Sequence, residues 1–320
     1  MSPEDAGFVV GLDLGGTKIL SVCLDASLSV VGRDFRETEA EGGPDAVIAR
    51  MVESARAAAA GREMRAIGVS APGPLDTGQG IVTEAPNLPG WINIPLRQRI
   101  RELSGIPAWI ENDANAAAVA EHRIGAGRGS QHMVLVAVGT GVGGGLILDG
   151  RLYRGASGGA GEVGHMIVDA GGVICACGRT GCLEAVASGR ALDTAARQIA
   201  ADEPDGGIVR VARRESEEPG ARTLDLAAAE GDASAIAALT RAGNFLGAGL
   251  TNLTNLLNPN VIVIAGSVRK SEVYVRSAIE VLDRDAFAQH RADVRVVLAG
   301  LGDEAPAIGT ALIAIENLGA

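Results

Sequence analysis

The chain has 320 residues, enough for one large domain or two lobes, and 47% of them are hydrophobic although only 2% are aromatic, so its core must be aliphatic. The formal net charge of −11 argues against a nucleic-acid-binding protein, which would need a basic face. No apolar run reaches the ~18–20 residues that span a bilayer, and no basic segment precedes the first apolar run as in a secretory signal. We therefore expect a cytoplasmic protein without membrane partners.

Strands and helices alternate along the sequence, which predicts an α/β fold. Residues 8–12 and 19–24 are apolar runs of the length typical of buried strands, and the polar turn Asp13–Lys18 separates them. In chain order we then expect strands at 29–32, 66–70 and 108–110, helices at 44–60, 95–104 and 113–123, and a loop at 81–91, where prolines and a glycine interrupt the pattern.

The order of the first elements recurs from residue 134. An apolar run at 134–138 precedes the glycine loop Gly139–Gly144 and a second strand at 145–148, and Asp149-Gly150 predicts a hairpin turn before 151–153. This internal repeat predicts two similar lobes that face each other, with both glycine loops at one cleft.

The second half of the chain is expected to be mainly helical. Residues 202–222 mix charges without a clear period, so we expect an exposed and mobile excursion there. Asp232 is a good N-cap for a long helix that ends at Asn258-Pro259. The other predicted elements are helices at 184–201, 271–283 and 306–317, the last returning to the first lobe, and strands at 261–265 and 294–299.

The turn Asp13–Lys18 is a candidate phosphate site. Gly15 and Gly16 allow the backbone to approach a phosphate, Thr17 adds a hydroxyl donor, and Asp13 is a candidate ligand for Mg²⁺. A plain hairpin turn is the alternative interpretation.

The segment Gly139–Gly145 predicts phosphate binding more strongly. Five glycines in seven residues weaken a strand, so a compensating role is expected, and exposed N–H groups that face an anion would supply it. Gly266-Ser267, which follows the strand at 261–265, is a weaker candidate for a nucleotide contact.

Three cysteines and one histidine form a candidate metal site. His165, Cys175, Cys177 and Cys182 offer one nitrogen and three sulfurs, a complete tetrahedral zinc set with no position left for a catalytic water. A zinc ion there should be structural, and three free thiols in a loop are the alternative.

Two carboxylates flank this cluster. If zinc binds one nitrogen of His165, the other nitrogen can donate to a ligand, while Glu162 and Glu184 can accept hydrogen bonds from vicinal hydroxyls. This combination favours a polyol, although each glutamate alone could be a solvated charge or a helix cap.

The run Glu111–Asn115 (ENDAN) follows the strand at 108–110. In α/β folds, side chains at the carboxyl end of a strand face the ligand. Asp113 could take the proton of a hydroxyl that attacks a phosphoryl group. A helix N-cap explains the position of Asp113 equally well.

Taken together, these motifs resemble those of the ROK family of sugar kinases and sugar-responsive repressors. The resemblance covers residues 8–317 and depends on DLGGTK (13–18), ENDAN (111–115), GTGVGGG (139–145), EVGH (162–165) and CACGRTGCLE (175–184). It implies the actin-like, ribonuclease-H-like two-lobe ATPase fold with an inter-lobe cleft. We expect a small lobe of residues 1–114 and 305–320, and a large lobe of residues 115–304 that contains the zinc loop, 165–184.

The resemblance also implies roles for individual residues. Asp113 would be the general base, and zinc would be bound by His165, Cys175, Cys177 and Cys182. ATP with Mg²⁺ would contact Asp13, Gly15, Gly16, Thr17, Lys18, Gly139, Thr140, Gly141 and Gly266. The sugar would be held by Asn87, Gly90, Asn112, Asp113, Glu162, His165 and Glu184.

Within the family, NLPGW (87–91) and the GCLE ending are most similar to the glucokinase type. This implies ATP-dependent phosphorylation of a hexose at its 6-hydroxyl, with glucose as the expected substrate and a homodimer or homotetramer as the expected assembly. N-acetylmannosamine, N-acetylglucosamine, fructose and mannose are alternative substrates, and polyphosphate is an alternative donor. A non-catalytic sugar sensor is the alternative class, but the family's repressors carry an N-terminal helix-turn-helix, and here only seven residues precede the first strand.

Overall fold

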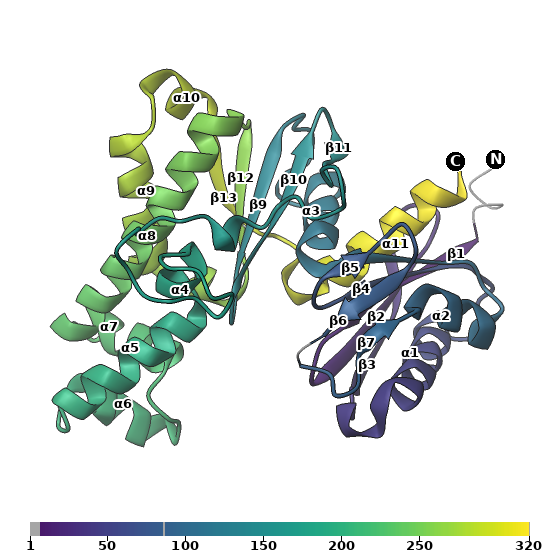
Figure 1. Ribbon diagram of the computed structural model, residues 1–320, viewed down its shortest axis with the longest axis horizontal. Coiled ribbons are helices and arrows are strands. Elements are labelled where there is room, and N and C mark those ends of the chain that lie inside the picture. The colour runs from purple at the N-terminus through teal and green to yellow at the C-terminus, as the bar shows by residue number, and fades with distance from the viewer. Residues whose placement is uncertain (1–6, 86, 320) are drawn as a thin grey trace. The chain divides into compact units, whose positions relative to one another are not determined.

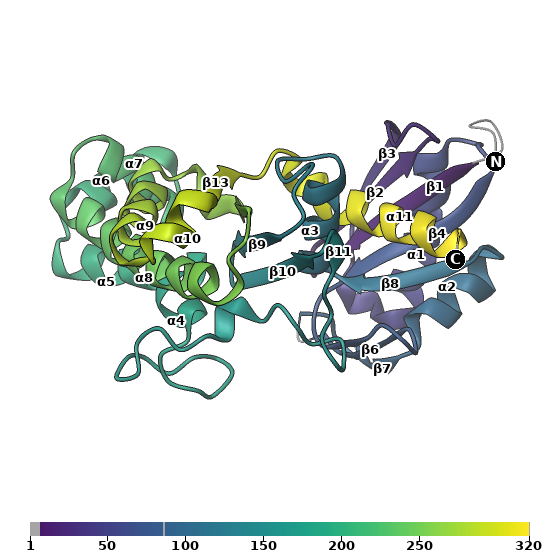
Figure 2. The ribbon, with the colours of Figure 1, turned by 90° about the horizontal axis from the view of Figure 1, so that it is seen from above.

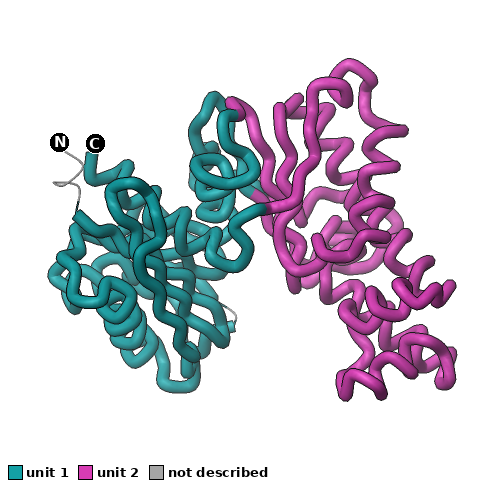
Figure 3. Tube along the Cα trace, turned by 180° about the vertical axis from the view of Figure 1, so that it is seen from behind, with its two compact units in different colours: residues 1–129, 145–161, 300–320 teal, residues 130–144, 162–299 magenta. Residues whose placement is uncertain are grey.

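A computed structural model describes residues 7–85 and 87–319 of the chain (Figure 1). Two compact units are distinguished by their internal contacts (Figure 3): unit 1 comprises residues 1–129, 145–161 and 300–320, and unit 2 comprises residues 130–144 and 162–299. The division differs from the boundary expected after residue 114, because α3 (Asp113–Arg123) packs against α11 (Ala305–Leu318) and belongs to unit 1.

The elements follow the expected alternation of strands and helices. Up to α3 they are β1 (Phe8–Leu14), β2 (Lys18–Leu24), β3 (Val30–Glu37), α1 (Gly43–Ala59), β4 (Met64–Ala71), β5 (Leu75–Asp76), β6 (Ile81–Glu84), β7 (Ile92–Ile94), α2 (Leu96–Ser104) and β8 (Ala108–Asn112). Beyond α3 they are β9 (Met133–Val138), β10 (Val142–Leu148), β11 (Arg151–Leu152), α4 (Leu183–Ala187), α5 (Gly189–Asp202), α6 (Gly207–Glu215), α7 (Ala221–Ala229), α8 (Ala233–Leu257), β12 (Val261–Ala265), α9 (Glu272–Asp285), α10 (Ala288–Asp293), β13 (Arg295–Leu298) and α11.

The internal repeat is confirmed by the strand order. Across the described residues, one five-stranded sheet has the order β3-β2-β1-β4-β8, another has the order β11-β10-β9-β12-β13, and β5, β6 and β7 form a small third sheet. In both large sheets a hairpin is followed by parallel strands: β4 pairs in parallel with β1 and β8, and β12 pairs in parallel with β9 and β13.

The first sheet is covered on both faces (Figure 2). Val10 and Leu12 of β1 are buried in the aliphatic core that includes α1. The alternate residue Gly11 faces α11, where a Cβ would lie 1.8 Å from the carbonyl oxygen of Ala307; Gly68 of β4 meets the carbonyl of Thr310 in the same way. Side chains alternate across a strand, so glycine on one face allows α11 to lie directly on the sheet.

A buried carboxylate organises the end of α3. Glu121 is fully buried, and its oxygens accept hydrogen bonds from the backbone N–H groups of Ala126 at 2.8 Å, Gly300 at 3.2 Å and Leu301 at 2.8 Å. Burial of a carboxylate is costly unless such bonds satisfy it. Glu121 therefore joins two segments of unit 1 that are far apart in the sequence.

The long helix of unit 2 forms as its termini predict. Asp232 caps α8, with its carboxylate accepting the N–H of Ala235 at 2.9 Å, and the helix ends at Asn258, whose φ of 42° lies in the left-handed region before Pro259. None of the helices in the described part of the chain is long and apolar enough to cross a membrane.

Two segments differ from expectation. Residues 202–222 contain α6 and the start of α7 rather than an exposed excursion, because Ile208, Val211 and Ala212 form a buried helical face between charged residues. Residues 81–91 contain β6, which pairs with β5 and β7, so the expected loop is in part a strand; residue 86 lies outside the described residues.

Candidate active site

The turn between β1 and β2 is closed by backbone hydrogen bonds and held by Thr38, the residue that follows β3. The N–H of Gly15 donates to the carbonyl of Lys18 at 2.8 Å, and the hydroxyl of Thr38 donates to the carbonyl of Gly15 at 2.7 Å. The N–H of Thr38 also donates to the carbonyl of Thr17 at 2.9 Å. These bonds occupy carbonyl oxygens, the groups that would repel a phosphate.

Asp13 lies beside Ser70 of the neighbouring strand β4, in parallel register. The buried hydroxyl of Ser70 donates to Asp13 Oδ1 at 2.5 Å. Burial raises the pKa of Asp13 to about 6, and the charge of Asp113 acts in the same direction, while Ser70 and the Lys18 ammonium oppose the shift. A bound Mg²⁺ would favour the ionised form, which suits Asp13 as a ligand to the metal or to its waters.

Asp113 is the first residue of α3, and Asn112 is the N-cap. Asn112 Oδ1 accepts the N–H groups of Ala114 at 3.0 Å and Asn115 at 3.1 Å. The alternative that Asp113 itself caps the helix is therefore wrong. The carboxylate of Asp113 is accessible to solvent and accepts the N–H of Ala114 at 2.8 Å.

Although solvent reaches Asp113, protein surrounds it on most sides. The resulting loss of hydration raises its pKa above the usual carboxyl range, and the N–H of Ala114 opposes the shift. A carboxylate with a raised pKa is a stronger base toward a hydroxyl proton. Asn112, whose oxygen is used as a cap, retains an amide group that can donate to a ligand.

The NLPGW loop lies against the turn between β1 and β2. Leu88 and Trp91 are buried and anchor it. Asn87 is exposed, and its Cβ lies 3.1 Å from where a Cβ on Gly16 would be. Gly90 has a φ of +77°, which side chains rarely adopt, so the turn itself requires glycine at this position.

The glycine loop of unit 2 is shorter than expected. β10 begins at Val142, so the turn comprises Gly139–Gly141, and the later glycines lie in the strand. Gly145 illustrates the reason, since a Cβ there would lie 2.5 Å from the Cβ of Ala118 on α3. Close packing of a strand on a helix, rather than phosphate contact, accounts for that glycine.

The turn Gly139–Gly141 lies against the start of α5. The N–H of Gly189 donates to the carbonyl of Gly139 at 2.8 Å, and the N–H of Arg190 donates to the carbonyl of Thr140 at 3.3 Å. A Cβ on Gly139 would meet no atom within 4 Å, so one side of the turn is open. The carbonyl oxygens of this turn are bonded internally, and so is the N–H of Gly139, which donates to the carbonyl of Gly141 at 3.0 Å. An anion would therefore have to contact other N–H groups of the turn.

Gly266 follows β12 and lies next to the end of β9. Its φ of +86° is in the region that favours glycine, and a Cβ there would lie 2.1 Å from the carbonyl oxygen of Val138. The predicted nucleotide residues Gly139 and Gly266 are therefore neighbours at one edge of the second sheet.

Glu184 makes a contact that the sequence did not predict. Its Oε2 accepts the N–H of Val142 at 3.0 Å, and a Cβ on Gly141 would lie 2.4 Å from the same oxygen. Glycine at 141 thus permits α4 to hold the first residue of β10.

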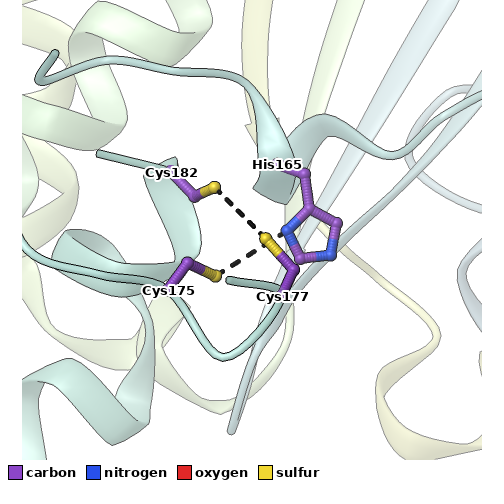
Figure 4. Close-up of side chains that lie close together, drawn as sticks. All are labelled: His165, Cys175, Cys177 and Cys182. Atoms are coloured by element: carbon purple, nitrogen blue, oxygen red, sulfur yellow. Dashed lines mark hydrogen bonds between the residues drawn. The ribbon is translucent and has the colours of Figure 1, made fainter. Parts of the chain in front are cut away.

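His165, Cys175, Cys177 and Cys182 converge on one centre (Figure 4). Their ligand atoms all lie within 4.8 Å of one another, with His165 Nδ1 3.9 Å from Cys175 Sγ and Cys177 Sγ 3.6 Å from Cys182 Sγ. Zn–S bonds of ~2.3 Å in a tetrahedron place sulfurs about 3.8 Å apart. The four donors therefore fit a zinc ion in both chemistry and spacing.

The second nitrogen of His165 points away from this centre. His165 Nε2 lies 4.0 Å from an oxygen of Glu162, a side chain that is largely exposed. If Nδ1 binds a metal, Nε2 carries the proton and can donate it to a ligand.

The predicted residues thus form two groups. Unit 1 holds the DLGGTK turn, the NLPGW loop, Asn112 and Asp113; unit 2 holds the turn Gly139–Gly141, Gly266, Glu162, Glu184 and the four metal-binding candidates. Sequence reasoning missed Thr38 and Ser70, because their partners Gly15 and Asp13 are 23 and 57 residues away in the chain. Ser188 caps α5, and a serine before an alanine-rich helix is a signal that could have identified the start of this helix.

The repeated sheet order, with a glycine-containing turn after the first strand of each sheet, is that of the actin-like, ribonuclease-H-like ATPase fold. Comparison with known proteins then identifies the family. The sequence profile of the ROK family matches residues 9–317, and the chain belongs to this family.

Several relatives resemble the chain over nearly its whole length. The glucokinase of Thermotoga maritima is 32% identical over 312 residues, which are 97% of this chain and 98% of that protein. A ROK family glucokinase from Streptomyces griseus, solved in complex with glucose and AMPPNP, is 31% identical with a TM-score of 0.84 and covers 97% of this chain and 100% of its own. The xylose repressor of Bacillus subtilis is 31% identical over 327 residues, covering 98% of this chain and 78% of the repressor.

Proposed function

We propose that the protein is an ATP-dependent hexose kinase that converts glucose to glucose 6-phosphate. The observation that carries the proposal is the identity of about 32% to a glucokinase over 97% of the chain. The arrangement of Asp113, exposed to solvent at the start of α3 beside the fixed Asn112, supports it.

In the proposed reaction Asp113 accepts the proton of the sugar's 6-hydroxyl as that oxygen attacks the γ-phosphoryl group of ATP. The bond between the γ-phosphorus and the β,γ-bridging oxygen breaks, and ADP leaves. Phosphoryl transfer depends mainly on positioning and on neutralisation of phosphate charge. Asn112 and Asn87 donate to sugar hydroxyls through their amide groups. Gly90 shapes the loop that carries Asn87.

The donor, in this proposal, is ATP with Mg²⁺, which supplies charge neutralisation at the transferred phosphate. Asp13 would bind the metal or its waters. The phosphates would contact N–H groups of the two glycine turns other than those of Gly15 and Gly139, which donate to Lys18 and Gly141 within their turns. Lys18, now paired with the exposed Asp303 at 3.6 Å, is a further cation for the phosphates. The remaining nucleotide contacts are assigned to Gly15, Gly16, Thr17, Gly139, Thr140, Gly141 and Gly266.

We also propose that a structural zinc ion occupies the four-donor cluster and fixes His165. Its coordination would be complete with His165, Cys175, Cys177 and Cys182, so zinc would order the loop rather than activate water. His165, Glu162 and Glu184 would then present donors and acceptors to the sugar hydroxyls.

A coupled assay across glucose, mannose, fructose, N-acetylglucosamine and N-acetylmannosamine, run with ATP and with polyphosphate, tests the proposal. We expect the highest kcat/KM with glucose and ATP. A higher kcat/KM with another sugar would assign that sugar as the substrate, and a higher kcat/KM with polyphosphate would assign polyphosphate as the donor. No turnover on any sugar would favour a sugar sensor. Light scattering after size exclusion tests the expected homodimer or homotetramer.

A further inference from the structure

Glu111 is a buried carboxylate whose two oxygens are both bonded. It is 1% exposed, and Oε2 accepts from Nε and Nη2 of Arg154, each at 2.8 Å. Oε1 accepts the side-chain amide of Asn115 and the backbone N–H of Asn112, each at 3.1 Å. A buried charge requires this degree of compensation, so the arrangement around Glu111 is fixed.

These bonds hold the chain on both sides of Asp113. Asn112 immediately precedes Asp113, and Asn115 lies half a helical turn beyond it. The carboxylate of Asp113 itself is bonded to the N–H of its neighbour Ala114, which does not tie it to another segment. The direction in which Asp113 points is therefore set by the backbone that Glu111 holds.

The backbone of Arg154 begins a glycine-rich loop. Its carbonyl accepts the N–H of Ala160 at 3.1 Å, which closes residues 154–160 into a compact turn. Gly155, Gly158 and Gly161 have φ values of 71°, 89° and 93°, so this loop depends on glycine conformations rather than on regular secondary structure. The loop leads directly to Glu162 in the sequence. Arg154 thus links the strand that precedes Asp113 to the segment that precedes the sugar-binding candidates.

We propose that the Glu111–Arg154 ion pair is the positioning element for Asp113, a role that rests on the proposed kinase reaction. Arg154 neutralises Glu111 and directs its carboxylate, and Glu111 fixes Asn112 and Asn115. Asp113 is in this way held at the orientation needed for proton transfer. Neither Glu111 nor Arg154 contacts the reacting atoms.

The test is a double-mutant cycle between Arg154→Met and Asp113→Asn, with kcat and KM measured for glucose and ATP. A small misplacement of a catalytic group can lower turnover on the order of 100-fold. We expect Arg154→Met to lower kcat by about 10- to 100-fold in the unaltered enzyme, with KM for ATP within about twofold. In the Asp113→Asn enzyme the same change should lower the residual kcat less than about twofold, because the group it positions is already lost.

Two variants keep the cycle interpretable. Arg123→Met removes an exposed Arg–Glu pair of unit 1, between Arg123 and Glu316 at 2.8 Å, and should leave kcat unchanged. Arg154→Lys keeps the cation but loses the two-nitrogen contact, so it should give an intermediate kcat and serves if the methionine variant does not fold. Equal loss of kcat in both backgrounds, or unaltered kcat in Arg154→Met and Arg154→Lys, would overturn the positioning role. An unaltered enzyme that phosphorylates no sugar would instead overturn the proposed function, and the positioning role with it.

Discussion

The two large sheets share one strand order but carry different groups at the ends of their strands. In the first sheet, β1 carries Asp13 near its end and β8 leads to Asp113; the surroundings of both carboxylates raise their pKa values. In the second sheet, β9 and β12 lead to Gly139 and Gly266, two residues without side chains that lie at one edge of that sheet. One repeated topology thus carries titratable carboxylates in one copy and glycine backbone, without side chains, in the other.

The largest effect is expected from neutralising the carboxylate after β8. Asp113→Asn keeps the size of the side chain but removes the proposed proton acceptor, so kcat should fall at least ~100-fold while glucose binding stays measurable. Steady-state kinetics and calorimetric titration with glucose check this. Near-normal turnover would show that the first sheet does not supply the base.

The second test concerns the metal cluster, because a metal would hold His165, the histidine that we propose binds the sugar, in unit 2. Chelation of zinc, or Cys177→Ser, should raise KM for glucose by about 10- to 100-fold and lower the melting temperature. Metal analysis should find close to one zinc per chain. Cys23→Ala, which alters a buried cysteine outside the cluster, is the control and should retain zinc; unchanged KM in the chelated protein would contradict the role.

A third test separates the two glycines of the second sheet's turn. Gly141→Ala places a methyl group against Glu184 and should lower the free energy of unfolding by roughly 1–3 kcal/mol, since the hydrogen bond to Val142 is lost. A Cβ at position 139 meets no atom within 4 Å, so Gly139→Ala should change the free energy of unfolding by less than about 0.5 kcal/mol.

Both variants should raise KM for ATP by roughly tenfold, about 1.4 kcal/mol, if phosphates approach the turn closely. Denaturant unfolding and kinetics on the two proteins check the pair. A normal KM in Gly139→Ala would remove the phosphate contact from this turn.

The last test concerns how the stability of the first sheet depends on pH. The pKa of Asp13 is raised from 3.8 to about 6 in the folded protein. Between pH 3.8 and about 6 the unfolded chain loses this proton while the folded protein keeps it, so the free energy of unfolding falls as pH rises. Asp13→Asn should therefore be more stable than the unaltered protein at pH 7–8 without Mg²⁺, by at most about 3 kcal/mol, and no more stable near pH 4.

Urea unfolding across this pH range measures the difference. Asp25→Asn is the control: the pKa of that exposed carboxyl is lowered by its bond from Ser27, so the variant should gain no stability at high pH. A pH-independent difference for Asp13→Asn would contradict the raised pKa.

Local sequence signals were sufficient for most of the fold, whereas the roles assigned to the site residues stay predictions. Apolar runs located β1, β9 and β12, and the spacing of the histidine and cysteines predicted a cluster that the structure brings together. The helices at 202–222 were missed because their apolar residues are interspersed with charged ones, so the short buried face was overlooked.

What sequence reasoning could not provide are contacts between distant segments. Glu111 was part of a recognised motif, but its partner Arg154 is 43 residues away and lies in no pattern that suggests a pair. Likewise the glycines of β10 suggested a loop, because the helix that packs against Gly145 is not visible from a local window. Both features depend on contacts between segments that are distant in the sequence.

Unit 1 is assembled from three separate stretches of chain, and α11 follows every residue of unit 2 in the sequence. The glycine-lined face of β1 and β4 cannot be covered until α11 leaves the ribosome, whereas every residue of unit 2 has by then been made. Domains generally fold as units during translation. One face of the first sheet therefore stays uncovered in the nascent chain until α11 has emerged, so loss of α11 should leave an aggregation-prone product rather than a smaller folded protein.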